Sequence, residues 1–337
     1  MTITALAPLF PGDSRIEFGQ REYRSPGPGE LLIRIGANAI CGTDRNEYFR
    51  GTTIVPGHEA AGVVAEAGEN TSLPVGTRGA IYLMDFCGAC RACRLGATNQ
   101  CSAKRQDVGQ SSDGGFGPFA LVHESQFFPI PDELSLVEAT MLLDVMGTST
   151  HALRRSELVR ADAESLYVAG AGPIGLGLVV MAKIRYGSDF PVYVSDVSPW
   201  RREFAATFGA IPLDALDADA ISAVQPDLAF DSSGKQLARE TALHALSKRG
   251  SLICVGHGEG LTIDVSNDLI APERAVLGSE YFRFDEMPDN LETLLTNREV
   301  IGRIVTHRMP VEKLPEAFEL FLGGETGKVV VTQDGAE

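Results

Sequence analysis

The sequence of 337 residues is too long for a single hydrophobic core, so we expect two domains. A net charge of −16 at pH 7 argues against a nucleic-acid or anionic-membrane partner, because no basic patch could dominate the electrostatic field. No apolar run approaches the about 18 residues that span a bilayer, and the N-terminus lacks the basic region of a signal peptide. The six cysteines do not form a disulfide framework, which predicts a cytoplasmic protein.

The first part of the chain predicts short β-strands and turns. Residues 30–35 follow a Pro-Gly-Pro-Gly turn and are typical of a buried strand. Two Gly-rich bends follow, Cys41-Gly-Thr-Asp and Gly57-His58-Glu59, and each contains a residue type that binds metals. Alone, a single Cys or His is more often structural than a ligand.

The strongest motif is a C-x2-C-x2-C-x7-C cluster formed by Cys87, Cys90, Cys93 and Cys101, within a lobe of about residues 85–105. Four thiolates at this spacing can surround one Zn²⁺. The alternative, a pair of disulfides, is not expected in a reducing compartment. Four protein ligands leave no open position, so this zinc would be structural and any chemistry would lie elsewhere.

Together, Cys-Gly-Thr-Asp, Gly-His-Glu-x-x-Gly and the four-cysteine lobe resemble the zinc-dependent medium-chain alcohol dehydrogenase family. The resemblance implies an α/β fold in which residues 1–150 form a GroES-like β-rich catalytic domain and residues 151–277 a Rossmann domain. Residues 278–337 would then return to the first domain. It also implies NAD, two zinc ions per chain (one catalytic and one structural), and a homo-oligomer, since relatives are dimers or tetramers.

Residues 135–155 predict a helix with Ser135 as its N-cap and Glu138 completing a capping box. Asp144 lies in an apolar run of this helix, and taken alone it would be assigned to the solvent-exposed face of the helix. The resemblance to the polyol and threonine dehydrogenase branch implies instead that Asp144 is the third ligand of the catalytic zinc. His151, which follows in a Thr-His-Ala-Leu segment, is then expected to be packed.

A second unit is expected from about residue 160. A predicted strand at 165–168 leads into Gly170-x-Gly172-x-x-Gly175, with Pro173 and Ile174 at the start of an apolar helix. In this strand–turn–helix context the glycines predict a dinucleotide site, with free N–H groups of the helix facing the diphosphate.

Asp196 ends the next predicted strand, 21 residues after Gly175. A carboxylate there should accept hydrogen bonds from the adenosine ribose and repel a 2′-phosphate, which favours NAD over NADP. Arg201 and Arg202 follow closely and could neutralise a phosphate, although the resemblance implies a basic residue at Arg201 in NAD-dependent members too.

Strands and helices then alternate to residue 255, as in a doubly wound parallel sheet. Val255 and Gly256 end the strand where the nicotinamide half should cross the sheet. Cys254 within this strand is expected to be core. Helices at 287–297 and 311–321 and a final strand at 328–332 complete the predicted elements.

The resemblance implies that Cys41, His58 and Asp144 hold the catalytic zinc and leave one position for water or substrate. Zinc would act as a Lewis acid while hydride passes from the alcohol to the nicotinamide. Thr43 would take the alcohol proton. Family members commonly end this relay with a His, but Asn46 stands there and cannot titrate, so Glu47 or solvent could serve instead.

Glu59 would lie beside the metal and assist water exchange. The resemblance to the polyol, sugar, cyclitol and threonine branch implies the oxidation of a secondary alcohol, in a polyol, a sugar or a cyclitol. Three alternatives stay open: threonine or aminocyclitol oxidation, a zinc-free NADPH reductase, and a non-catalytic zinc-stabilised NAD-binding protein. The four-cysteine lobe and the Cys/His pair disfavour the reductase.

Overall fold

The computed structural model describes residues 2–333, which pack as two units. The first unit comprises residues 2–143, 283–323 and 328–333, and the second comprises residues 144–282 and 324–327. The chain therefore enters the second unit at residue 144, returns to the first at residue 283, and adds a short segment, 324–327, to the second unit before its last strand. No helix within residues 2–333 is long and apolar enough to cross a membrane.

The strands of the first unit pair antiparallel, except for the last two strands of the chain, which pair parallel to each other. β1 (Thr2–Gly12) and β2 (Arg15–Arg24) form a long hairpin, where the sequence predicted only short strands. A larger sheet has the order β14-β15-β3-β4-β5-β7, with β6 also pairing with β3. Its strands are β3 (Glu30–Ala39), β4 (Glu59–Ala67), β5 (Arg78–Ile81), β6 (Phe119–His123), β7 (Phe127–Pro129), β14 (Val305–Pro310) and β15 (Lys328–Thr332).

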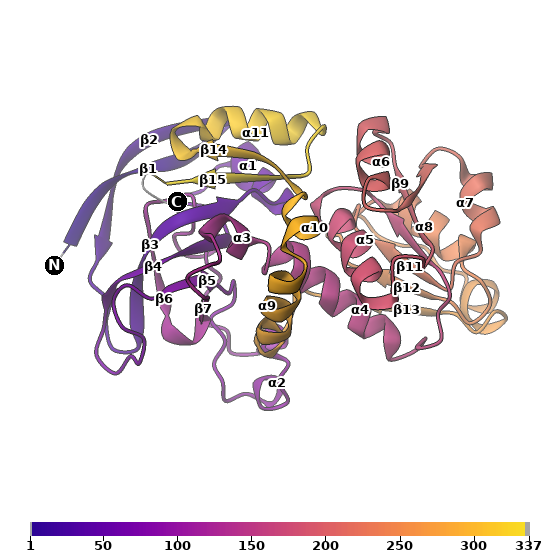
Figure 1. Cartoon of the computed structure of the whole chain (residues 1–337), viewed down its shortest axis with the longest axis horizontal. Helices are drawn as coiled ribbons and strands as arrows, with labels where there is room; N and C mark the ends of the chain where they lie inside the picture. The colour runs from indigo at the N-terminus through magenta and orange to yellow at the C-terminus, as the bar shows by residue number, and fades with distance from the viewer. Residues whose placement is uncertain (1, 334–337) are drawn as a thin grey trace. The chain divides into compact units, whose positions relative to one another are not determined.

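Helices close the first unit around two apolar clusters. Figure 1 shows the yellow helix α11 (Leu314–Gly323) beside β14 and β15, and its Leu314 and Phe318 are buried with Val329 and Val331 of β15. A second cluster lies on β3, β4 and their neighbours and includes Ile33 and Val64. The other helices are α1 (Arg45–Arg50), α2 (Arg91–Arg94), α3 (Leu136–Thr140), α9 (Met287–Thr296) and α10 (Arg298–Gly302).

The second unit is a six-stranded parallel sheet of order β10-β9-β8-β11-β12-β13. Numbered from the first strand of this unit, the order is 3-2-1-4-5-6, which is the doubly wound dinucleotide-binding topology expected from the sequence. The strands are β8 (Leu166–Ala169), β9 (Val192–Asp196), β10 (Ile211–Asp214), β11 (Leu228–Asp231), β12 (Ser251–Cys254) and β13 (Ala275–Gly278).

Helices α4 (Ser149–Glu157), α5 (Pro173–Tyr186), α6 (Pro199–Ala206), α7 (Ala218–Val224) and α8 (Gln236–Ala245) complete this unit. Buried residues of α8, among them Ala242 and Leu243, pack with Tyr167 of β8 and Leu252 of β12. Cys254 is half-buried at the end of β12.

The continuous helix predicted for residues 135–155 is wrong. α3 ends at Thr140, a π-helical segment η4 spans Asp144–Thr148, and α4 begins at Ser149. The predicted capping box is present, with the Ser135 side chain accepting from the Glu138 N–H. The η4 segment is closely packed, because a Cβ on Gly147 would lie 2.4 Å from the ring of Phe282. Single π turns within helices are frequent at functional sites.

Candidate active site and zinc lobe

The antiparallel pairing of β3 with β4 brings Cys41 and His58, the candidate zinc ligands of the two Gly-rich bends, close together. The register pairs Ala39 with Glu59, so Cys41, just beyond β3, and His58, just before β4, emerge at the same end of the two strands. The candidate ligand atoms of Cys41, His58 and Glu59 lie within 4.8 Å of one another. All three side chains are buried. A thiolate, an imidazole and a carboxylate at this spacing suit Zn²⁺.

Asp44 lies against both Cys41 and His58, and the sequence did not single it out. Its Oδ2 accepts a hydrogen bond from the Cys41 N–H at 2.8 Å, and its Oδ1 lies 3.4 Å from His58 Nδ1. The Thr43 hydroxyl lies 3.4 Å from His58 Nε2. A carboxylate on one ring nitrogen fixes the orientation of a metal-binding histidine and leaves the other nitrogen for the metal. The only sequence signal was an acid three residues after Cys41.

Glu59 is joined to a residue from the far end of the chain. Lys328, the first residue of β15, donates to Glu59 Oε1, and the two side chains are 1% and 0% exposed. The cation compensates a carboxylate that is removed from water. Lys328 was also missed, because no local motif links two residues that lie 269 positions apart.

The residues of the predicted proton relay lie on η1 (Gly42–Asp44) and α1. Thr43 is partly buried beside His58, whereas Asn46 is exposed. Burial, together with the nearby charge of Asp44, raises the pKa of Glu47. The structure therefore provides the Thr43 hydroxyl beside the His58 ring and the titratable carboxylate of Glu47 on the following helix.

Asp144 is the first residue of the second unit and of η4, and its side chain is buried. Leu143, to which it is bonded, belongs to the first unit. The preceding helix α3 packs on β3, β4 and β5. His151 lies in α4 and is buried, as expected for a packed residue.

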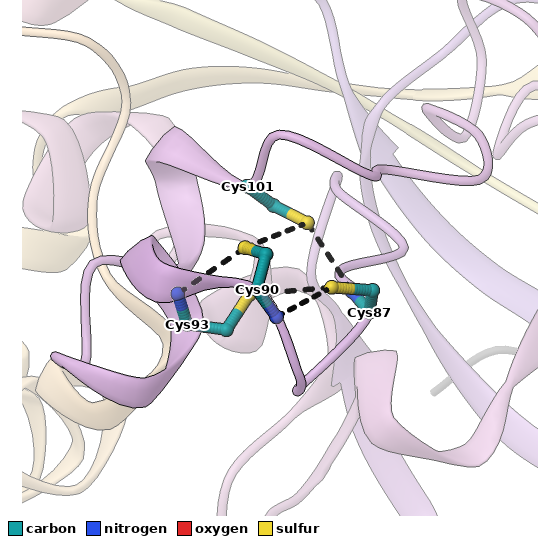
Figure 2. A group of neighbouring side chains, drawn as sticks. All are labelled: Cys87, Cys90, Cys93 and Cys101. Carbon is teal, nitrogen blue, oxygen red and sulfur yellow. Dashed lines mark hydrogen bonds between the residues drawn. The ribbon is translucent and has the colours of Figure 1, made fainter.

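The four cysteines of the lobe converge, as Figure 2 shows, and their sulfurs lie within 4.8 Å of one another. The Cys87 and Cys93 sulfurs are 4.0 Å apart, and those of Cys90 and Cys101 are 3.9 Å apart. A tetrahedron with Zn–S bonds of about 2.3 Å requires sulfur separations of about 3.8 Å. All four are free thiols rather than disulfides.

The electrostatics of the lobe also fit a cation. The Cys93 N–H lowers the pKa of Cys90 to about 5, and N–H groups of Ala89 and Cys90 lower that of Cys87. Burial and the neighbouring thiols raise the pKa of Cys93 to about 12. Backbone N–H groups therefore favour the thiolate form of Cys87 and Cys90, and a bound cation would favour it at Cys93 too.

The C-terminal return anchors this lobe within the first unit. Arg283 Nε donates to the carbonyl of Gly96 at 3.0 Å, and the Phe284 N–H donates to the Thr98 hydroxyl at 2.8 Å. The ring of Phe284 also packs edge-on against Tyr82. The lobe is thus held by residues that are distant in sequence.

The glycine turn of the second unit joins β8 to α5. Gly170 has a φ of +99°, which favours glycine, and a Cβ on Gly175 would lie 1.9 Å from the Gly170 carbonyl. Gly172 is the N-cap and Pro173 the first residue of α5. Ile174 follows in the first turn. This open helix start, without a side-chain cap on Gly172, suits a diphosphate.

Asp196 lies at the end of β9, beside this turn. Its Oδ2 accepts from the Ala171 N–H at 2.9 Å, and its Oδ1 accepts from the Ser198 N–H at 2.8 Å. Arg201 Nη1 of α6 lies 3.9 Å from the same carboxylate. Arg202, in contrast, donates to the Asp196 carbonyl and lies 3.4 Å from Asp214.

Val255 and Gly256 follow β12, and their N–H groups donate to the Asp231 carbonyl at the end of β11 at 2.9 and 2.8 Å. In an open parallel sheet, ligands bind beyond the carboxyl ends of the strands. The predicted dinucleotide residues of the second unit therefore all lie along one sheet edge.

Comparisons with known proteins agree with this arrangement. Residues 27–132 match the family model of the alcohol dehydrogenase GroES-like domain, and residues 173–297 match that of zinc-binding dehydrogenases. The chain is 31% identical over 334 residues to the L-threonine 3-dehydrogenase of Pyrococcus horikoshii, covering 93% of this chain and 94% of that protein. It is 31% identical over 314 residues to the L-galactonate-5-dehydrogenase of Escherichia coli, with 89% and 90% covered.

A solved structure, acetophenone reductase from Geotrichum candidum in complex with NAD, matches with a TM-score of 0.85 at 26% identity. The match covers 98% of this chain and 97% of that one. The fold, the two groups of candidate zinc ligands and the family matches thus define an oxidoreductase that uses zinc and a nicotinamide cofactor. The chain belongs to the zinc-dependent medium-chain alcohol dehydrogenase family.

Proposed function

We propose that this protein oxidises a secondary alcohol of a polyol, a sugar or a cyclitol to a ketone, with NAD as the hydride acceptor. The observation that carries the proposal is the buried set of Cys41, His58 and Glu59, with Asp44 Oδ1 lying 3.4 Å from His58 Nδ1. The four-cysteine lobe would hold a second zinc in a structural role.

Cys41 and His58 supply two ligands of the proposed catalytic zinc, and Asp144 supplies the third. Three observations support Asp144. Its side chain is buried, a π-helical turn begins at it, and it directly follows Leu143, which belongs to the same unit as Cys41 and His58. Replacing a thiolate by a carboxylate makes the ligand set harder and keeps its total charge. Glu59, held by Lys328, supports the site and assists water exchange.

When bound, zinc supplies a Lewis acid for the alcohol oxygen and NAD supplies the hydride acceptor. The residues of this chain position the alcohol and move its proton. Thr43, whose hydroxyl lies beside His58, accepts the proton and hands it on. Asn46 cannot accept it, so Glu47 or solvent receives it, and the raised pKa of Glu47 suits a proton acceptor that is recycled.

The NAD preference rests on Asp196. Its carboxylate would accept hydrogen bonds from the adenosine ribose and repel a 2′-phosphate. The turn from Gly170 to Gly175 would face the diphosphate, with Arg201 nearby, and Val255 and Gly256 would face the nicotinamide half. We also propose that the protein works in the cytoplasm as a homo-oligomer, as the family resemblance implies.

An amino-alcohol substrate is the second candidate. It is favoured by the similarity to the Pyrococcus horikoshii protein, which is named for threonine. Such a substrate would need a further charged contact for its amino or carboxyl group.

An initial-rate screen of zinc-replete protein with NAD⁺ and NADP⁺ in parallel tests the proposal. The panel contains sugar alcohols, free sugars, inositols, aminocyclitols, threonine and simple alcohols. We expect turnover with NAD⁺ and one polyhydroxylated class. Turnover of threonine or aminocyclitols alone would favour the second candidate. Silence across the panel, with two zinc ions per chain confirmed, would favour a non-catalytic role.

A further inference from the structure

We infer that Arg239 is a positioning residue that fixes the loop after β12, residues 256–260, as the platform for the nicotinamide half of the cofactor. The inference rests on the proposed function, because it assumes that a nicotinamide dinucleotide lies along this sheet edge. Neither the cofactor motifs nor the family comparison singles out Arg239.

The contacts of Arg239 cross from α8 to two loops. Its Nε donates to Asp231 Oδ2 at 2.6 Å, at the end of β11. Its two terminal nitrogens donate to the backbone carbonyls of Glu259 and Gly256. Arg239 is 8% exposed and Asp231 is fully buried. A guanidinium can serve three acceptors in fixed directions at once, whereas an ammonium is a point charge on a flexible stem.

Asp231 extends the same network to the loop after β11. Its Oδ1 accepts from the Ser233 N–H at 2.9 Å, from the Ser233 hydroxyl at 2.6 Å and from the Gly234 N–H at 3.1 Å. A buried ion pair therefore links the two loops, and both of its partners make further hydrogen bonds to loop residues. Because the desolvation of both charges offsets much of their attraction, we assign this pair a role in fixing geometry rather than in adding stability.

Glycines let these two loops pack backbone against backbone. The Glu259 N–H donates to the Gly234 carbonyl at 2.8 Å, and a Cβ on Gly256 would lie 2.5 Å from the Gly234 nitrogen. Gly234 has a φ of +69°, and a Cβ there would lie 2.1 Å from the His257 carbonyl. A shift of one loop must therefore move the other.

This network lies at the carboxyl ends of β11 and β12, where Val255 and Gly256 would meet the nicotinamide half. The adenosine half is assigned to the ends of β8 and β9, where Asp196 contacts Ala171 and Ser198 rather than Arg239. Loss of the Arg239 contacts should thus affect one half of the cofactor and spare the other.

The test compares Arg239→Lys with the wild-type protein by fluorescence titration with NADH and by titration with ADP-ribose, which lacks the nicotinamide. We expect the Kd for NADH to rise about tenfold, since two or more hydrogen bonds to the loop are lost, and the Kd for ADP-ribose to stay within about twofold. Hydrogen exchange at the Gly256 and Glu259 amides should also accelerate.

Arg274→Lys is the matched control. Arg274 also donates to backbone carbonyls, those of His244, Leu246 and Ser247, but these precede β12 and lie at the opposite end of that strand. Its replacement should leave both dissociation constants unchanged. If Arg239→Lys does not fold, Asp231→Asn weakens the same pair and should give the same split between the two ligands.

Unchanged NADH binding in the folded variant would overturn the inference. An equal loss of NADH and ADP-ribose binding would do so too, since it indicates general destabilisation of the unit. Failure of the wild-type protein to bind either ligand would instead refute the proposed function, and the inference with it.

Discussion

The ion pair between Lys328 and Glu59 is fully buried, so removal of its cation should destabilise the folded protein. We predict that Lys328→Met lowers the free energy of unfolding by about 3–5 kcal/mol, because a carboxylate at the start of β4 would lose its compensating charge. Urea unfolding followed by circular dichroism measures the change. The double variant with Glu59→Leu should recover part of the loss.

Lys313→Met serves as the control for this prediction. Lys313 pairs with Glu316 on the surface, where both side chains are more than half exposed, and such pairs contribute about 0–1 kcal/mol. Equal effects of the two lysine substitutions would contradict the importance of burial at Lys328.

The contacts of Asp44 predict an effect on metal binding. Asp44→Asn should weaken the affinity of the proposed catalytic zinc about 10–100-fold, because the carboxylate that lies 3.4 Å from His58 Nδ1 and accepts from the Cys41 N–H becomes a neutral amide. Competition with a chelator, followed by metal analysis, measures the loss. The lobe zinc is an internal control, and retention of both ions with unchanged affinity would refute the prediction.

Asp196 should govern cofactor choice. Asp196→Ala should shift the ratio of kcat/KM for NADP⁺ over that for NAD⁺ upward by about tenfold or more, since a charged hydrogen-bond acceptor for the ribose is lost and its repulsion of a phosphate disappears. Steady-state rates with both cofactors measure the ratio. The control is Asp189→Ala, in the exposed turn after α5, which should leave the preference between NAD⁺ and NADP⁺ unchanged. An unchanged preference in Asp196→Ala would contradict the assignment of Asp196 to the ribose.

At the scale of elements, local motifs predicted the convergence of the four cysteines and the glycine turn before α5, because each is encoded in a few consecutive residues. The four-cysteine lobe and the turn from Gly170 to Gly175 are of this kind. Asp44 and Lys328 could not be assigned from sequence, because their roles depend on side-chain direction and on the pairing of distant strands. The break at η4 was missed because no proline in residues 135–155 marks it.

The contact between α4 and α5 gives a pH-dependent prediction. Glu157 of α4 accepts from Arg185 Nη2 at 2.6 Å and from the Tyr186 hydroxyl at 2.8 Å, both in α5. The Arg185 hydrogen bond lowers the pKa of Glu157 below its ordinary value of 4.5. The stabilisation is therefore present above pH 4.5 and is lost as the pH falls through the folded-state pKa.

Glu157→Gln should consequently be less stable than the wild type at pH 7 by up to about 1 kcal/mol, since the pair is partly exposed. The difference should shrink towards the lowest pH at which both proteins remain folded. Thermal unfolding at several pH values measures it, and a difference that is constant with pH would exclude the ion pair as its source.

At the scale of the whole molecule, the sequence predicted the two-part α/β architecture because the strand–helix alternation after residue 160 is regular. It did not predict β13 or β14, whose residues lack strict hydrophobic alternation. The return of the chain is what completes the first unit: residues 283–333 supply β14, β15 and α11, anchor the lobe through Arg283 and Phe284, and deliver Lys328 to Glu59.

The central claim is that chemistry occurs at the zinc held by Cys41 and His58, and not at the lobe. The most direct test measures turnover, NADH binding and zinc content of Cys41→Ala beside the wild type, with the best substrate of the panel. We predict that turnover falls to background while NADH binds with unchanged affinity and the lobe zinc remains. Turnover equal to that of the wild type would contradict the claim.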